Sequence, residues 1–171
     1  MKPKLILCLA FVLSGGLFGC KTAQPSDAQI YYNDAKYDFT FSLPAEWRGY
    51  SIVMERWDAP LYETADSSEK VVGTENGPLI VLRHPLWRTN DLYQDIPIMV
   101  FTHKQWQEEY QGKFFPYAGG VISEMWHNSK YVFGLYSRYN AYDAVKGWKE
   151  AGDIIATNCA VRTTPSLYPN L

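Results

Sequence analysis

The residues that could act as nucleophiles do not lie in the arrangements that catalysis requires. Ser67 and Lys70 have the S-x-x-K spacing in which a lysine assists an acylating serine. The partner motifs Ser-Asp-Asn and Lys-Thr-Gly are absent from the sequence, as is the Gly-x-Ser-x-Gly turn of many hydrolases. No histidine or basic residue lies directly beside Cys159 to activate its thiol. We therefore predict a protein without catalytic residues, which is not an enzyme.

The histidines do not form a metal-binding motif. His84, His103 and His127 are widely separated, and none has the short spacing to another histidine or cysteine that zinc sites show. His84 and His127 lie at the ends of predicted strands and Asp95 lies between two strands, so a site of mixed ligands would require three segments to converge. Isolated histidines are more often hydrogen-bonded parts of the scaffold. We predict no metal and no cofactor.

Aromatic side chains are the remaining feature that could recognise a ligand. They make up 16% of the chain, with 6 Trp, 13 Tyr and 8 Phe, and most of them are expected to fill the core. The predicted strands at residues 121–126 and 130–136 are apolar on both faces, so a helix must cover part of this surface and the rest could line a groove. We predict a ligand-facing set made of Trp87, Trp126, Tyr136, Arg83 and Arg138.

The charge of the chain argues against a nucleic-acid partner. Its 171 residues include 16 basic and 18 acidic side chains, which gives a net charge of −2. A phosphate backbone attracts proteins with a strongly basic surface, and this composition provides none. The length and the apolar fraction of 47% are those of one ordinary folded domain.

The first twenty residues have the pattern of an export signal. Lys2 and Lys4 precede the apolar run 5–13, which is shorter than the ~20 residues that span a bilayer. The segment Leu17-Phe18-Gly19-Cys20 resembles the bacterial lipobox. The resemblance implies that residues 1–19 are a lipoprotein signal peptide and that Cys20 carries the lipid that anchors the chain in a membrane. The alternatives are a plain secretory peptide or a buried apolar N-terminus.

The lipobox also sets the expected domain organisation and location. Residues 20–29 are small and polar and would form a lipid-anchored tether, residues 30–160 the folded domain and residues 161–171 a loose C-terminal tail. Lys21 stands where an aspartate would retain the protein at an inner membrane. We therefore expect the outer membrane, facing the periplasm, in a host with two membranes, and otherwise the outer face of the cell membrane. Cys159 would be the only cysteine left without a lipid, so we expect no intramolecular disulfide.

Hydrophobic periodicity predicts the elements of the domain. The strands are expected at residues 37–43, 50–57, 79–82, 98–101, 121–126 and 130–136, with an exposed loop or weak hairpin at 59–76. A helical turn is expected at 45–48, and helices at 103–110 and 142–156. Short connections and late helices favour the α+β class, with an antiparallel sheet of about six strands covered by two or three helices.

Three short segments resemble known families. The strand that runs into Leu43-Pro44-Ala45-Glu46-Trp47 resembles the start of PsbP-type domains. Residues 95–102 and 128–133 resemble a family of uncharacterised secreted bacterial proteins. The resemblance implies a PsbP-like sandwich over residues 30–158, in a family whose members mostly act as binding or assembly factors. No ligand residue of that family transfers to a position of this sequence.

These observations leave three functions open. The first is a non-catalytic binding or assembly module at the cell envelope, which would hold an envelope protein, a peptidoglycan fragment or another small ligand. The second is a structural subunit of an envelope complex, which would require an exposed apolar patch. The third is a small hydrolase with a scattered active site, which would require titratable groups clustered in one pocket.

Overall fold

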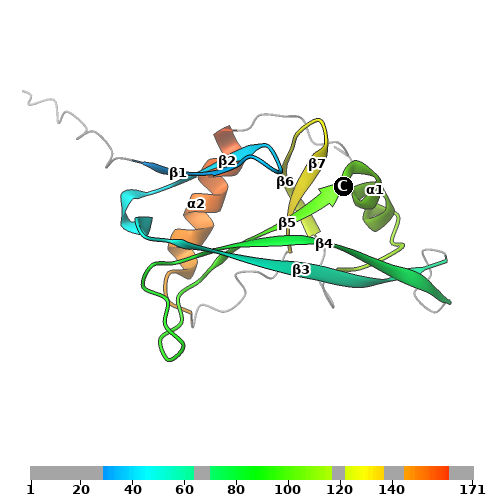
Figure 1. Ribbon diagram of the computed structural model, residues 1–171, viewed down its shortest axis with the longest axis horizontal. Helices are drawn as coiled ribbons and strands as arrows, with labels where there is room; N and C mark the ends of the chain where they lie inside the picture. The colour runs from blue at the N-terminus through cyan, green and yellow to red at the C-terminus, as the bar shows by residue number, and fades with distance from the viewer. Residues whose placement is uncertain (1–28, 64–69, 117–121, 137–144, 162–171) are drawn as a thin grey trace, which may run out of the picture.

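The chain folds into an α+β domain with two antiparallel sheets. The computed structural model describes residues 29–63, 70–116, 122–136 and 145–161. These residues form seven strands, two α-helices and one short 3-10 helix (Figure 1). In chain order the elements are β1 (Ile30–Asp34), β2 (Phe39–Leu43), η1 (Ala45–Trp47), β3 (Ser51–Tyr62), β4 (Val71–Arg83), β5 (Ile96–Thr102), α1 (His103–Tyr110), β6 (Ile122–His127), β7 (Tyr131–Tyr136) and α2 (Trp148–Val161).

The predicted class is confirmed, but the predicted single sheet of about six strands was wrong. The seventh strand is β1, which pairs only with β2 and forms a separate sheet with it. Its sequence shows no clear alternation and ends in Asn33 and Asp34, two residue types that are rare in strands. The strand forms because it pairs with β2 along its whole length, from Ile30 opposite Leu43 to Asp34 opposite Phe39.

The larger sheet has the strand order β3-β4-β5-β7-β6, with every neighbouring pair antiparallel. β3 and β4 form a long hairpin that extends beyond the rest of the sheet (Figure 1). Of the two alternatives expected for residues 59–76, an exposed loop or a weak hairpin, the hairpin is confirmed, since residues 59–62 and 71–76 belong to it. Most side chains of this stretch are exposed or half-buried, so polar residues are compatible with strands here, whereas Ala59 is buried.

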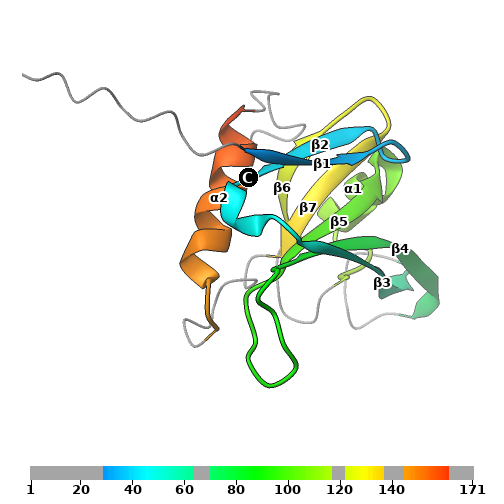
Figure 2. The same cartoon turned by 60° about the vertical axis from the view of Figure 1, so that its left-hand side comes forward.

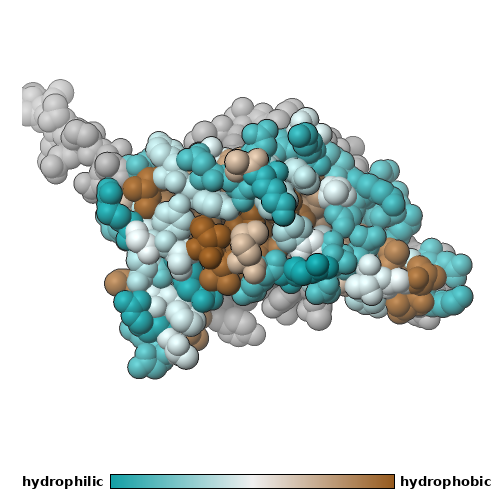
Figure 3. Space-filling view, in the orientation of Figure 1, coloured by the Kyte–Doolittle hydropathy of each residue, from teal (hydrophilic) through white to brown (hydrophobic). Residues whose placement is uncertain are grey.

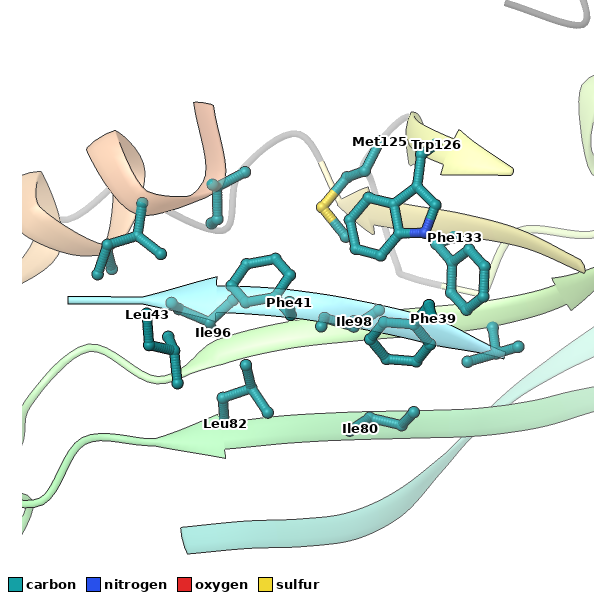
Figure 4. Close-up of a cluster of buried hydrophobic side chains, with 14 of the residues drawn as sticks. Phe39, Phe41, Leu43, Ile80, Leu82, Ile96, Ile98, Met125, Trp126 and Phe133 are labelled. Carbon is teal, nitrogen blue, oxygen red and sulfur yellow. The ribbon is translucent and has the colours of Figure 1, made fainter. Parts of the chain in front are cut away.

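One face of the larger sheet is covered by two further elements, and we call it the closed face. It carries Ile80 and Ile98, which are covered by the β1–β2 sheet and α2, while Met54, opposite Ile80 on the edge strand β3, stays exposed (Figure 2). The predicted alternation of β2 is confirmed: its buried side chains Phe39, Phe41 and Leu43, like Tyr37 just before it, pack in this core. Figure 4 shows the β2 side chains lying over those of β4 and β5, beside Met125, Trp126 and Phe133.

Helix α2 is fixed to β2 by one buried side chain. Asn158 is 4% exposed, accepts a hydrogen bond from the backbone N–H of Ser42 (2.8 Å) and donates one to the Ser42 carbonyl (2.9 Å). The helix begins at Trp148 and not at residue 142 as predicted, and residues 142–144 lie outside the described residues. Gly147 precedes the helix with a φ of +75°, a left-handed conformation that favours glycine and that a continuous right-handed helix cannot contain.

The opposite face of the larger sheet is covered at one end only, and we call it the half-open face. It carries the row Glu55, Leu79, Met99 and Gly134. Helix α1 covers one end of this face, at the residues predicted for it, and begins with a capping box in which Thr102 and Gln105 exchange hydrogen bonds. The buried core at this end of the half-open face contains Trp57, Ala59, Met99, Phe101, Trp106, Phe114, Ile122 and Val132.

Candidate functional site

Arg83 and Asp95 form an ion pair at the uncovered end of the half-open face. Arg83 ends β4 and Asp95 immediately precedes β5, and the register that pairs Leu82 with Ile96 brings the two side chains to the same edge. Nε of Arg83 donates to Oδ2 of Asp95 at 3.1 Å. Both side chains are largely buried, with 28% and 19% exposed. A hydrogen bond between two partly desolvated charges fixes the guanidinium group in place.

Trp87 holds the same guanidinium group from a second direction. The Cζ atom of Arg83 lies 4.1 Å from the centroid of the Trp87 ring, which is a cation–π contact. The two terminal nitrogens of Arg83 form no hydrogen bond within the described part of the chain. The Asp95 carboxylate and the Trp87 ring therefore fix the orientation of Arg83. The N–H groups of its two Nη atoms remain available to donate hydrogen bonds to a ligand.

The ion pair lines a cavity of about 390 Å³ on the half-open face. Four apolar residues of β4 and β5 line part of it: Leu79, Val81, Pro97 and Met99. Glu55 comes from β3, on the same face as Leu79 by register, and is exposed. The other described lining residues are Arg56, Trp57, Asp58, Gln94, Pro116 and Tyr136. Such a cavity combines apolar surface with a few charged groups, as small-molecule sites do.

The charge of Asp95 is only partly compensated. Its Oδ1 atom is buried and accepts no hydrogen bond within the described residues. Burial raises the pKa of Asp95 above its ordinary value and the nearby Glu55 carboxylate adds to this, while Arg83 and the backbone N–H of His84 act in the opposite direction. The described lining of the cavity carries three carboxylates, those of Glu55, Asp58 and Asp95, and two guanidinium groups, those of Arg56 and Arg83, so it has an excess of one negative charge.

Residues 84–95 project from the sheet as a loop whose base is well packed (Figure 2). His84 is 5% exposed, stacks on Tyr93 with ring centroids 4.5 Å apart, and meets the edge of Trp47 at 4.8 Å. Its Nδ1 accepts a hydrogen bond from the backbone N–H of Leu86, and burial lowers its pKa. Farther along, Asp91 pairs with Lys146 at 2.6 Å. These contacts position Trp87 beside Arg83.

A larger cavity of about 790 Å³ lies between the end of β2, η1 and the start of α2. Several of its polar groups already have partners. Glu150 accepts a hydrogen bond from Trp47 Nε1 at 2.7 Å, Lys149 pairs with Asp153 at 2.7 Å, and Asn158 is bonded to Ser42. The Arg83–Asp95 cavity is the better candidate site, because its charged groups keep unused hydrogen-bonding capacity.

The structure brings together three of the predicted ligand-facing residues. Arg83 and Tyr136 line the cavity and Trp87 contacts Arg83. Trp126 does not belong to this group: it is 2% exposed, lies on the closed face and stacks on Phe133 with centroids 5.0 Å apart. The last of these residues, Arg138, lies outside the described residues, as does the predicted lipid-attachment residue Cys20.

Sequence reasoning did not include Asp95 and Glu55 in the ligand-facing set. A signal existed for Asp95, because an acidic residue just before β5 must face the end of β4 if the two strands form an antiparallel pair. Glu55 gave no comparable signal, since its position on this face depends on the register of the long β3–β4 hairpin.

The histidines converge only in part. The rings of His103 and His127 lie 6.1 Å apart, whereas His84 packs against Trp47 and Tyr93. Nδ1 of His127 is 2.7 Å from Glu124 Oε1, and Nε2 of His103 is 2.9 Å from the Asn128 carbonyl. Among the described residues, no three histidine, cysteine, aspartate or glutamate side chains gather in a way that could hold a metal ion.

Comparison of the chain with protein-family models, curated proteins and solved structures gives no match. Within the residues described, neither α-helix has the length and apolar character needed to cross a membrane.

Proposed function

We propose that this protein is a lipid-anchored, non-catalytic binding module of the bacterial cell envelope, carrying a PsbP-like α+β domain. The Arg83–Asp95 cavity is the observation that carries the binding role, because it offers oriented donors, incompletely satisfied acceptors and apolar surface in one place. The lipobox Leu17–Cys20 and the PsbP-like segment around Leu43-Pro44 support the anchor and the family. The anchor would place the domain on the outer membrane facing the periplasm, or on the outer face of a single membrane, with no nucleic-acid partner.

The lipid anchor is tested by metabolic labelling. Cells that express the full chain are grown with labelled palmitate, with and without globomycin. We expect labelled mature protein, accumulation of the precursor in globomycin, and loss of both effects in Cys20→Ala. Cys8→Ala is the matched control, because Cys8 lies in the same signal but outside the lipobox. Unchanged labelling and processing of Cys20→Ala would overturn the anchor.

The binding role is tested by photo-crosslinking in cells. A photoreactive amino acid replaces Trp87 beside the cavity or, as a control, Lys104, whose side chain is 80% exposed on α1. We expect an adduct at position 87 that Arg83→Lys weakens, and none at position 104. Recovery of the protein alone at both positions, together with turnover of a substrate panel by the pure protein, would contradict a binding module.

A second candidate function, a structural subunit of an envelope complex, is favoured by the β3–β4 hairpin. Figure 3 shows an apolar patch at the far end of this hairpin, where Val71 and Val72 are 54% and 49% exposed. Such side chains on a projecting arm suit contact with another protein. If this function holds, replacing both valines by threonine should dissolve a high-mass complex in native gels that Arg83→Lys leaves intact.

The third function, a small hydrolase, has less support. The described residues that line the Arg83–Asp95 cavity include no serine, threonine, cysteine, lysine or histidine. Of the groups that line it, only carboxylates and Tyr136 are available for covalent or acid–base chemistry.

A further inference from the structure

We infer that the Arg83–Asp95 cavity binds a free amino acid with an apolar side chain, in its zwitterionic form. The carboxylate of the ligand binds Arg83, and its ammonium group lies against the carboxylates of Asp95 and Glu55. This inference rests on the proposed binding function and names the ligand class of the same site.

Arg83 provides the carboxylate-binding half of the site. Its Nε donates a hydrogen bond to Asp95 at 3.1 Å, and one face of its guanidinium group lies over the Trp87 ring. These two contacts hold the group in one orientation. The terminal nitrogens, which make no hydrogen bond within the described residues, form the planar fork that binds a carboxylate with two parallel hydrogen bonds. Because this orientation exists before the ligand arrives, little side-chain freedom is lost on binding.

Asp95 and Glu55 provide the ammonium-binding half. Asp95 forms an ion pair with Arg83, so a carboxylate that can accept hydrogen bonds from an ammonium group lies beside the carboxylate-binding guanidinium. Its buried Oδ1 accepts no hydrogen bond within the described residues, and Glu55 has no ion pair there. An ammonium group would compensate both carboxylates and relieve the repulsion between them. The two charged groups of an amino acid are close together, as this pairing of Arg83 and Asp95 requires.

The size and surface of the cavity limit the rest of the ligand. Its volume of about 390 Å³ is at the lower end of the range for small-molecule sites, ~300–1,000 Å³. Leu79, Val81, Pro97 and Met99 offer contact for an apolar side chain. A phosphate ester would place a doubly negative group beside Asp95 and Glu55 and would bring no positive charge of its own to neutralise these carboxylates, so it is disfavoured.

Isothermal titration of the full chain in detergent micelles tests the inference with three probes. L-Leucine carries both charged groups, N-acetyl-L-leucine lacks the ammonium group and L-leucinamide lacks the carboxylate. We expect L-leucine to bind at least tenfold more tightly than either analogue. Equal binding of the three probes, or no binding of L-leucine, L-methionine or L-phenylalanine, would overturn the inference.

Two variants locate the site. Arg83→Lys keeps the charge but loses the planar fork, so we expect at least a tenfold weaker affinity for L-leucine. Arg88→Lys is the matched control, because Arg88 lies in the loop that follows Arg83 and its guanidinium group donates to the carbonyls of Pro85 and Trp87. Equal affinity in both variants would place the ligand elsewhere and overturn the assignment. If Arg83→Lys does not fold, the three probes still decide the ligand class. Because lipidation of Cys20 is measured separately, failure here is distinguishable from failure of the proposed anchor.

Discussion

The two faces of the larger sheet are built from the same strands and differ in what covers them. On the closed face, the β1–β2 sheet and α2 bury a continuous apolar core in which Phe41 and Leu43 are 0% and 1% exposed. On the half-open face, α1 covers one end, and the other end carries the Arg83–Asp95 pair beside apolar side chains. The comparison indicates that the closed face provides stability and that the uncovered end of the other face is where recognition is possible.

The largest expected difference between the closed face and the projecting loop is the one between two tryptophans of the predicted ligand-facing set. Trp126 is buried among Phe39, Phe41 and Phe133, whereas Trp87 lies on the projecting loop beside Arg83. We expect Trp126→Ala to lower the free energy of unfolding by about 3–5 kcal/mol, because removing the indole ring leaves a cavity in a packed core. Trp87→Ala should lower it by less than about 1 kcal/mol. Urea unfolding followed by far-UV circular dichroism measures both, and equal losses would contradict the division between the faces.

A glycine under Trp57 tests how tightly the covered end of the half-open face is packed. A Cβ atom at Gly77 would lie 2.5 Å from the Trp57 ring, which stacks on Phe101 and Phe114 and donates to the Val100 carbonyl. Gly77→Ala must displace this ring, so we expect a loss of about 1–3 kcal/mol. The matched control is Gly73→Ala in the same strand, where the new atom would lie 3.9 Å from Leu61. Both are measured by urea unfolding, and equal stability of the two variants would show a loosely packed end.

Elements set by local chemistry could be predicted from the sequence. The alternation of β2 requires one buried face, and Pro44 ends the strand before η1. Helix α1 begins where the Thr102–Gln105 capping box places it. The start of α2 could not be predicted in this way, because the apolar period continues across Gly147 and only the backbone conformation of that residue shows the break.

The candidate site was harder to predict because it depends on cross-strand register. Arg83 and Asp95 are both visible in the sequence, but only the pairing of Leu82 with Ile96 makes them neighbours. Trp126 and Trp87 could not be distinguished, because both lie next to apolar or aromatic residues. The bulge between Glu124 and Trp126 changes the alternation of β6 and directs Trp126 into the closed face.

The smallest effect concerns the carboxylate of Glu109 on α1, at the covered end of the half-open face. Burial raises its pKa from 4.5 to about 7, although the backbone N–H of Ile122 acts in the opposite direction. Between pH 4.5 and 7 the folded chain therefore binds more protons than the unfolded chain, so the free energy of unfolding falls as the pH rises. Because the side chain is partly exposed, we expect a fall of roughly 1 kcal/mol.

Glu109→Gln should remove this fall in thermal unfolding scans across the range. Glu108→Gln, on the neighbouring residue that pairs with Lys104 at 3.9 Å, should retain it. An unchanged pH dependence in Glu109→Gln would mean that α1 leaves this carboxylate in solvent, and the covered end would then be less closed than its apolar core indicates.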